Sequence, residues 1–179
     1  MTWAGAILNS MGAATLVPLD EYLNTSYSPD REYRDGVLVE RNVGDKAHAR
    51  LQILLGKYVA QRRKQWNIEA YTELRIKLRP NWCPIPDVCI YALPEFEGRY
   101  PERPPLLWIE ILSEDDRFVD VWARARELVE AGVPFVWIVD PNTLESDLWS
   151  SAGRQPVPDK TLRLPDSPIV IPLLDVIEE

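Results

Sequence analysis

A run of large apolar residues lies near the middle of the chain, between two prolines and an acidic turn. It extends from Pro104-Pro105 to Ser113, and every residue of its interior is apolar except Glu110. A short apolar run bounded by breakers is typical of a strand that is buried on both faces. An ionised carboxylate removed from water costs several kcal/mol unless it is compensated. We therefore expect Glu110 to be paired with an arginine, protonated or bound to a metal ion.

Two longer segments have the spacing of amphipathic helices. Between Asp45 and about Trp66, apolar residues recur three and four positions apart, and Asp45 is a suitable N-cap. Residues 117–131 carry a second such stripe, and Gly132 follows at the position where helices commonly end. A shorter helix is predicted at residues 17–23, where a proline precedes two acids.

Strand patterns fill much of the remaining chain. An Asp-Gly pair predicts a hairpin over residues 32–40. Alternating apolar and polar residues predict a strand from 69 to 79, followed by a turn at 81–84. Two apolar runs predict buried strands at 86–91 and 135–139. Weaker strand patterns, of which the first two suit sheet edges, follow at 144–149, 161–164 and 168–176.

The order of these elements predicts the fold class. A strand, a helix and a second strand follow one another between residues 104 and 139, which makes a parallel βαβ unit with a right-handed crossover. We therefore expect an α/β protein in which helices flank a mixed central β-sheet. With 179 residues, the chain is most simply a loose segment at 1–16 followed by a single domain at 17–179.

Composition and charge narrow the function classes. No apolar run approaches the ~20 residues that a membrane helix needs, and no basic segment marks a signal peptide. Cys83 and Cys89 lack metal-site spacing, so we expect free thiols in a reducing cytoplasm. The net charge of −8 argues against non-specific coating of nucleic acid. Residues 41–80 nevertheless carry +7 and the rest −15, which permits a local anion-binding face.

Two acidic residues fall on consecutive predicted strands. Asp87 begins the strand at 86–91, and Glu110 lies within the next one. Because consecutive strands usually pair, we expect the two carboxylates to converge at one end of the sheet. The residues alone leave open whether this is an ion-paired cluster or a cation site.

Five short motifs occur together and in order within residues 17–177. They are Glu32-Tyr33-x-Asp35-Gly36, His48, Ile85-Pro86-Asp87-Val88, Ile109-Glu110-Ile111-Leu112-Ser113 and Gly132-Val133-Pro134-Phe135-Val136-Trp137-Ile138-Val139-Asp140-Pro141. In this combination the chain resembles the Uma-two family, a bacterial family assigned as endonucleases. The resemblance implies the restriction-endonuclease-like fold of the PD-(D/E)XK superfamily. Its core order of a helix, three strands, a helix and a strand agrees with the order read from the patterns.

The resemblance also implies a nuclease site. Asp87 would be the Asp of the PD motif and Glu110 the second acid, and together they would hold Mg²⁺ or Mn²⁺. Hard divalent cations prefer carboxylate oxygens and bridge to phosphate, where they can generate hydroxide and offset developing charge. The implied function is metal-dependent hydrolysis of nucleic acid, with DNA as the expected substrate, by a cytoplasmic protein. A homodimer is expected because such enzymes often cut both strands.

The sequence departs from the family pattern at the catalytic lysine. Leu112 lies two residues after Glu110, where the superfamily motif has lysine, and Arg124 stands where many Uma-two members have one. Arginine binds phosphate but stays protonated. We therefore consider Arg124 or Lys77 as phosphate contacts, and His48 as a further active-site candidate.

Two other function classes stay open at this point. If Arg124 serves only as the partner of Glu110, the chain is a nuclease-like protein that binds nucleic acid or a protein partner without cutting. Paired carboxylates can also hydrolyse glycosides without a metal, which would call for a cleft with exposed aromatic residues.

Overall fold

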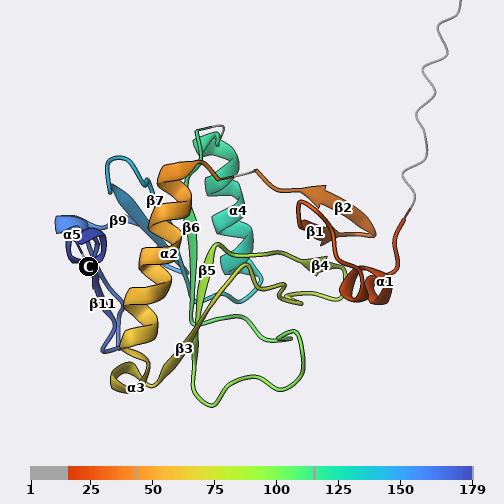
Figure 1. Cartoon of the computed structure of the whole chain (residues 1–179), viewed down its shortest axis with the longest axis horizontal. Coiled ribbons are helices and arrows are strands. Elements are labelled where there is room, and N and C mark those ends of the chain that lie inside the picture. Colours follow the sequence, from red (N-terminus) through yellow and green to blue (C-terminus); the bar gives the residue numbers. More distant parts are fainter. Residues whose placement is uncertain (1–15, 43, 115, 179) are drawn as a thin grey trace, which may run out of the picture.

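A mixed six-stranded sheet forms the centre of the molecule (Figure 1). The computed structural model describes residues 16–42, 44–114 and 116–178. The sheet order is β3-β5-β6-β7-β8-β9, with β6 and β7 parallel and the other neighbours antiparallel. Its strands are β3 (Ile68–Thr72), β5 (Val88–Ala92), β6 (Leu107–Ile111), β7 (Phe135–Val139), β8 (Ser146–Ser150) and β9 (Gly153–Pro156).

One long helix covers each face of this sheet (Figure 1). Helix α2 (Lys46–Gln61) packs Leu51 and Leu55 into a core that includes Ile109 of β6. Helix α4 (Phe118–Glu130) packs Leu128 into a second core, which includes Trp108 from the same strand. Neighbouring residues of β6 therefore point to opposite faces, as the period of a strand requires. This explains why the strand is apolar almost throughout.

A smaller three-stranded sheet lies to one side of the main sheet (Figure 1). Its order is β2-β1-β4, and its strands are β1 (Arg31–Arg34), β2 (Val37–Glu40) and β4 (Trp82–Cys83). With α1 (Leu19–Asn24) it encloses a minor cluster around Tyr22 and Tyr33. The buried Arg75 donates to Tyr22 O at 2.8 Å and forms an ion pair with Asp30, so this layer is joined by polar contacts as well as by packing.

The remaining elements lie on the α2 side of the molecule, except that η1 borders a cavity beside α4. They are α3 (Arg63–Trp66), the 3₁₀ turn η1 (Pro158–Lys160), β10 (Thr161–Arg163), β11 (Val170–Pro172) and α5 (Leu173–Glu178). Strands β10 and β11 pair antiparallel, and Leu173 and Val176 of α5 enter the α2 core. Within the described ranges, no helix has the length and apolar character needed to traverse a lipid bilayer.

Most of the predicted elements are present. The Asp-Gly hairpin is confirmed as β1 and β2, with Asp35 and Gly36 both at positive φ. Asp45 caps α2 by accepting a hydrogen bond from the His48 N–H group, and Gly132 follows α4 at φ +99°. The parallel pairing of β6 with β7 confirms the βαβ unit, and both cysteines are free and buried.

Other predictions need correction. The strand expected over 69–79 ends at Thr72, because Glu73 adopts a left-handed conformation with φ 52°. The turn expected at 81–84 contains β4 instead. The edge strand expected at 144–149 is interior, since β8 pairs with both β7 and the unpredicted β9. The loose segment predicted at 1–16 lies outside the described residues except for residue 16, and the single-domain assignment stays a prediction.

We predict that Leu128→Ala lowers the free energy of unfolding by about 2–5 kcal/mol, because Leu128 is fully buried between α4 and the sheet. Val119→Ala on the same helix is the matched control: its side chain is 67% exposed, so a change within about 0.5 kcal/mol is expected. Urea unfolding of both variants checks the prediction, and equal effects would contradict the assigned packing of α4.

Candidate active site

Asp87 and Glu110 are brought to the same end of the main sheet by the pairing of β5 with β6. In that antiparallel pair Val88 lies opposite Ile109, so continuing the register by one residue places Asp87 opposite Glu110. Both side chains line one cavity of about 220 Å³. The convergence expected from consecutive strands is therefore what the structure shows.

The Asp87 carboxylate is 5% exposed and is held from three directions. Its Oδ2 atom accepts a hydrogen bond from the Ile111 N–H group at 2.7 Å. The same oxygen lies 3.1 Å from Nε2 of His48 on α2, and beside a carboxylate this imidazole nitrogen acts as the donor. Oδ1 accepts from Arg41 at 3.1 Å. These contacts fix the orientation of the carboxylate.

The Glu110 carboxylate is bound on the α4 side of the sheet. Its Oε1 atom accepts hydrogen bonds from Trp108 Nε1 at 2.9 Å and from Arg124 Nε at 2.8 Å. The two outer nitrogens of Arg124 donate to both oxygens of Glu32, at 2.9 and 2.5 Å. Glu32 also accepts from the Ile85 N–H group at 3.0 Å. Arg124 thus bridges a carboxylate of β6 and one of β1.

These contacts shift the pKa values of the buried groups. Burial raises the pKa of Glu110 to about 7, while Arg124 opposes the shift and the nearby Asp87 adds to it. Burial by itself would lower the pKa of Arg124, but Glu32 and Glu110 outweigh it and the pKa is raised. The hydrogen bond to Asp87 raises the pKa of His48 above 6.5, against the effect of its own burial.

A second arginine joins the smaller sheet to α2 and the end of β3. Arg41, just beyond β2, forms an ion pair with Glu73 in addition to its contact with Asp87. Gln52 of α2 donates to Glu73 at 2.6 Å and to the Asp87 carbonyl oxygen at 3.0 Å. The network therefore holds Asp87 through its backbone and its side chain.

The cavity above these groups carries more acidic than basic side chains. Its charged lining combines five acids, two arginines and one histidine: Glu32, Glu40, Asp87, Glu110, Asp116, Arg41, Arg124 and His48. Glu40 is exposed and paired with Arg31, but the excess of the buried and half-buried carboxylates is unfavourable unless a cation or protons compensate it. Among the described residues, no three His, Cys, Asp or Glu side chains are gathered into a preformed metal cluster.

Four of the five residues considered from sequence line this cavity, and one does not. Asp87, Glu110, Arg124 and His48 lie around it. Lys77 lies outside the cavity as the described residues define it, and its ammonium group forms an ion pair with Glu102. The structure therefore leaves the arginines as the fixed cations of the site.

Two residues of the site were not predicted for it. Glu32 occurs in one of the recognised motifs, but nothing in the hairpin pattern shows that it turns inward to meet Arg124, which lies 92 positions away. Arg41 similarly meets Asp87 across 46 positions. The local charge excess in residues 41–80 includes Arg41, but it did not separate this arginine from its exposed neighbours.

The comparisons with known proteins bear on this arrangement. The model of the Uma2 family, described as "Putative restriction endonuclease", matches residues 19–176. The chain belongs to this family. The resemblance inferred from the short motifs is thereby confirmed. No curated protein matches the chain.

A solved structure shows the same fold as this Uma2 member. It is a protein from Anabaena variabilis ATCC 29413, described as a putative nuclease belonging to DUF820. The match has a TM-score of 0.75 and 21% sequence identity, and it covers 90% of this chain and 98% of that one. At this identity the likeness establishes the fold, which is restriction-endonuclease-like as expected.

We predict that Arg124→Met lowers the free energy of unfolding by about 3–5 kcal/mol, because it leaves the carboxylates of Glu32 and Glu110 without their shared partner. Arg34→Met is the matched control, since Arg34 pairs with Glu127 at a more exposed position and should cost about 1 kcal/mol or less. Urea unfolding at pH 8 measures both. A loss of similar size in the two variants would contradict the role of Arg124 as a half-buried bridge between Glu32 and Glu110.

We predict a pKa above 6.5 for His48, which proton NMR can follow directly because the chain has a single histidine. Charged His48 then contributes stability that is complete below pH 6.5 and is lost as the pH rises through the folded-state pKa. Asp87→Asn should lower this pKa by removing the hydrogen-bonded charge, whereas Asp20→Asn on α1 should leave it unchanged. A wild-type pKa at or below 6.5 would contradict the His48–Asp87 contact.

Proposed function

We propose that this Uma2 member is a divalent-cation-dependent endonuclease that hydrolyses phosphodiester bonds of DNA. The observation that carries the proposal is the convergence of Asp87 and Glu110 in one acidic cavity that also presents two arginines. Membership of a family described as restriction endonucleases supports the same reaction class. Fold alone would not, because one fold can carry many functions.

The residues of the cavity suit Mg²⁺ or Mn²⁺. Mg²⁺ is commonly bound by one or two carboxylates together with waters and phosphate oxygens, so Asp87 and Glu110 provide an adequate protein donor set. The raised pKa of Glu110 comes mainly from its burial, with a smaller contribution from the nearby Asp87, and Arg124 does not fully offset the two. When bound, such an ion supplies an activated water and offsets charge at the phosphate.

The protein groups have separate tasks in this proposal. Asp87 is kept in one orientation by His48 and by the Ile111 N–H group, so it presents its carboxylate to the cavity in a fixed direction. Arg124, clamped by Glu32, and Arg41 are the cations that can contact the scissile phosphate. Both guanidiniums already donate to carboxylates, so they would contact phosphate through their remaining N–H groups, and because they stay protonated they do not serve as a base.

A second candidate function is a nuclease fold that binds nucleic acid or a protein partner without cutting it. It is favoured by the contacts of Arg124, which donates to both Glu110 and Glu32 and can satisfy these carboxylates without a metal. The two candidates differ in whether the cavity takes up a divalent cation, so one measurement separates them.

We predict that wild type binds Mn²⁺ and cleaves DNA, and that Asp87→Asn and Glu110→Gln each weaken Mn²⁺ binding by about 10–100-fold and abolish cleavage. Asp120→Asn, at an exposed position in the first turn of α4, is the matched control and should behave as wild type. Titration calorimetry measures binding, and single- and double-stranded DNA incubated in the same samples reports cleavage. DNA binding without metal uptake at millimolar Mn²⁺ would establish the second candidate instead.

Metal affinity should also depend on pH. Because the pKa of Glu110 is raised to about 7, an incoming cation must displace a proton at lower pH. The affinity for Mn²⁺ is therefore expected to fall by up to about tenfold per pH unit below pH 7 and to level off above it. An affinity that is constant between pH 5.5 and 8 would show that Glu110 is not a ligand.

A further inference from the structure

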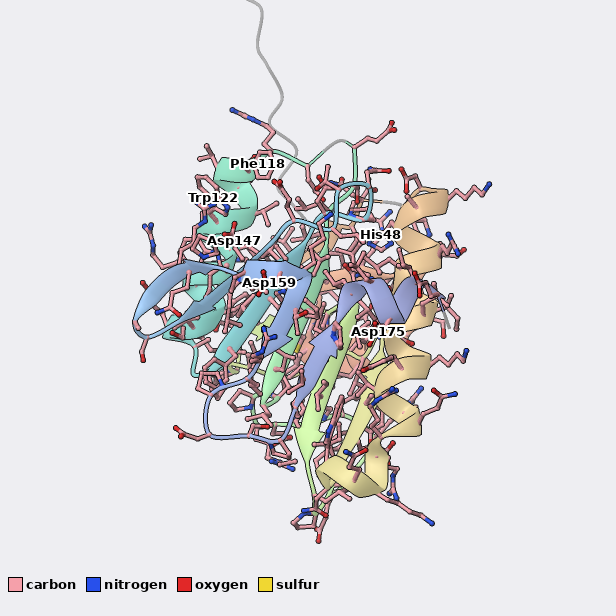
Figure 2. All side chains as sticks on the ribbon, turned by 90° about the vertical axis from the view of Figure 1, so that its left-hand side faces the viewer. His48, Phe118, Trp122, Asp147, Asp159 and Asp175 are labelled. Carbon is pink, nitrogen blue, oxygen red and sulfur yellow. The ribbon has the colours of Figure 1, made fainter. Side chains whose placement is uncertain are left out.

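A second and larger cavity lies on the other side of α4 from the candidate active site. Its volume is about 680 Å³, which is within the usual range for sites that enclose a small organic ligand. Figure 2 shows Phe118, Trp122, Asp147 and Asp159 on the side formed by α4, β8 and β9, with His48 on the α2 side. Nothing in the proposed hydrolysis uses these residues.

The cavity has an aromatic wall. Trp122 contacts Phe118, with ring centroids 5.9 Å apart, and Phe118 is 58% exposed. The guanidinium of Arg154 lies over the Trp122 ring, 4.4 Å from its centroid. Trp122 therefore already stacks a flat, nitrogen-rich group. Flat groups of this kind, including nucleic-acid bases, stack on aromatic rings with little dependence on their identity.

Carboxylates form the rim of the same cavity. Four acids line it, Asp140, Glu145, Asp147 and Asp159, against two cations, Arg154 and Lys160. Asp147 accepts from Arg154 at 2.9 Å, and Lys160 is engaged by the Thr143 carbonyl oxygen at 2.7 Å. A negatively charged rim repels phosphate, whereas its carboxylate oxygens can accept hydrogen bonds from amino groups. A carboxylate is the side chain that reads the amino group of cytosine in protein–DNA complexes.

Two polar atoms beneath this cavity have no hydrogen-bond partner among the described residues. They are Nε1 of Trp122 and the hydroxyl oxygen of Ser146, and both residues line the cavity. Buried polar atoms in folded proteins are paired in the great majority of cases, and unpaired ones mark strain, water or a ligand site. Nε1 of Trp137 and of Trp149, which do not line the cavity, are unpaired among the described residues as well, so the argument for an occupant rests on the aromatic wall and the carboxylates.

The two cavities share a wall. Leu112 lines both of them, at the end of the strand that carries Glu110. On α4, Val121 and Arg124 face the first cavity, whereas Phe118 and Trp122 face the second. The first cavity, at about 220 Å³, has room for a phosphate group and its ion, and the second, at about 680 Å³, has room for a base. A nucleic-acid strand that lies across Leu112 can therefore enter both.

We propose that the second cavity binds one unstacked, amino-bearing base of the nucleic acid, cytosine, adenine or guanine, while the adjoining phosphate occupies the candidate active site. The base would stack on Trp122 in the place of the Arg154 guanidinium and donate its amino hydrogens to Asp147, the carboxylate that Arg154 now contacts. Arg154 lies on the exposed strand β9 and can turn outward to admit it. Thymine and uracil lack the amino group and are discriminated against. That the base belongs to a nucleic acid rests on the proposed nuclease function. The test uses free nucleosides and does not depend on that function.

The test is a calorimetric titration of the full chain with 2′-deoxycytidine and with thymidine, in the absence of any divalent cation. Deoxycytidine is expected to bind at least about fivefold more tightly than thymidine. Trp122→Leu should weaken deoxycytidine binding by about tenfold, as loss of a stacking ring does. Asp147→Asn should remove the preference for deoxycytidine. Asp175→Asn on α5, exposed and on the α2 side in Figure 2, is the matched control and should match wild type.

Several results would overturn the assignment. They are the absence of saturable binding of either nucleoside, equal affinities for the two, or affinities that Asp147→Asn leaves unchanged. Tighter binding of N-acetyl-arginine amide, lost in the same variants, would assign the cavity to a cationic peptide instead. Circular dichroism of each variant identifies any that has failed to fold, and Asp147→Asn keeps the test valid if Trp122→Leu does not fold.

The outcome is independent of whether the protein cuts DNA. Nucleoside binding with the predicted preference, in a protein that takes up no metal and cleaves nothing, would support the base site and overturn the nuclease. Metal-dependent cleavage by a protein that binds neither nucleoside would leave the nuclease in place and overturn the base site.

Discussion

Burying Glu110 inside an apolar strand is the constraint on which the site depends. A carboxylate at this position is tolerated because Trp108 and Arg124 donate to the same oxygen, and Arg124 in turn needs Glu32 as a second anion. The charge of one residue in β6 thereby fixes the position of α4 against the sheet and of the hairpin against α4. Removing Arg124 leaves two carboxylates without their shared partner, which costs at least as much as losing an apolar contact of the same size.

Asp87, the second carboxylate of the site, is also held by groups from several elements. Its carboxylate is held by a backbone N–H group of β6, an imidazole of α2 and a guanidinium beyond β2. The main sheet supplies the position, and the surrounding elements supply the orientation. An acidic cavity assembled in this way is preorganised, because its charged groups are held before any ligand arrives. Preorganisation of this kind is what electrostatic stabilisation of a reacting phosphate requires.

The sequence predicts those helices and strands well whose formation depends on residues close together in the chain. The apolar run ending at Ser113 and the stripe of α4 are determined by residues a few positions apart, and both elements form as expected. The strand expected over 69–79 ends early because the chain turns at Glu73, with φ 52°, and an alternation of apolar and polar residues does not reveal such a turn. Asp87 and Glu110 were found because consecutive strands pair. Glu32 and Arg41 were not, since their contacts come from the docking of a separate sheet.

That separate sheet has a further consequence. The layer built from α1, β1, β2 and β4 has its own small cluster, and it meets the rest of the molecule through Trp82 of β4, which enters the α4 core, and through the ion pairs of Arg75, Arg124 and Arg41. The ion pairs of the β1–β2 hairpin can open while Trp82 keeps its place in the α4 core, which is a sub-global fluctuation and not unfolding. Each opening would separate Arg124 from Glu32 and Asp87 from Arg41 at the same moment. Competence of the site and persistence of the fold are thus two different equilibria, and the first can be tuned by evolution, temperature or salt without moving the second.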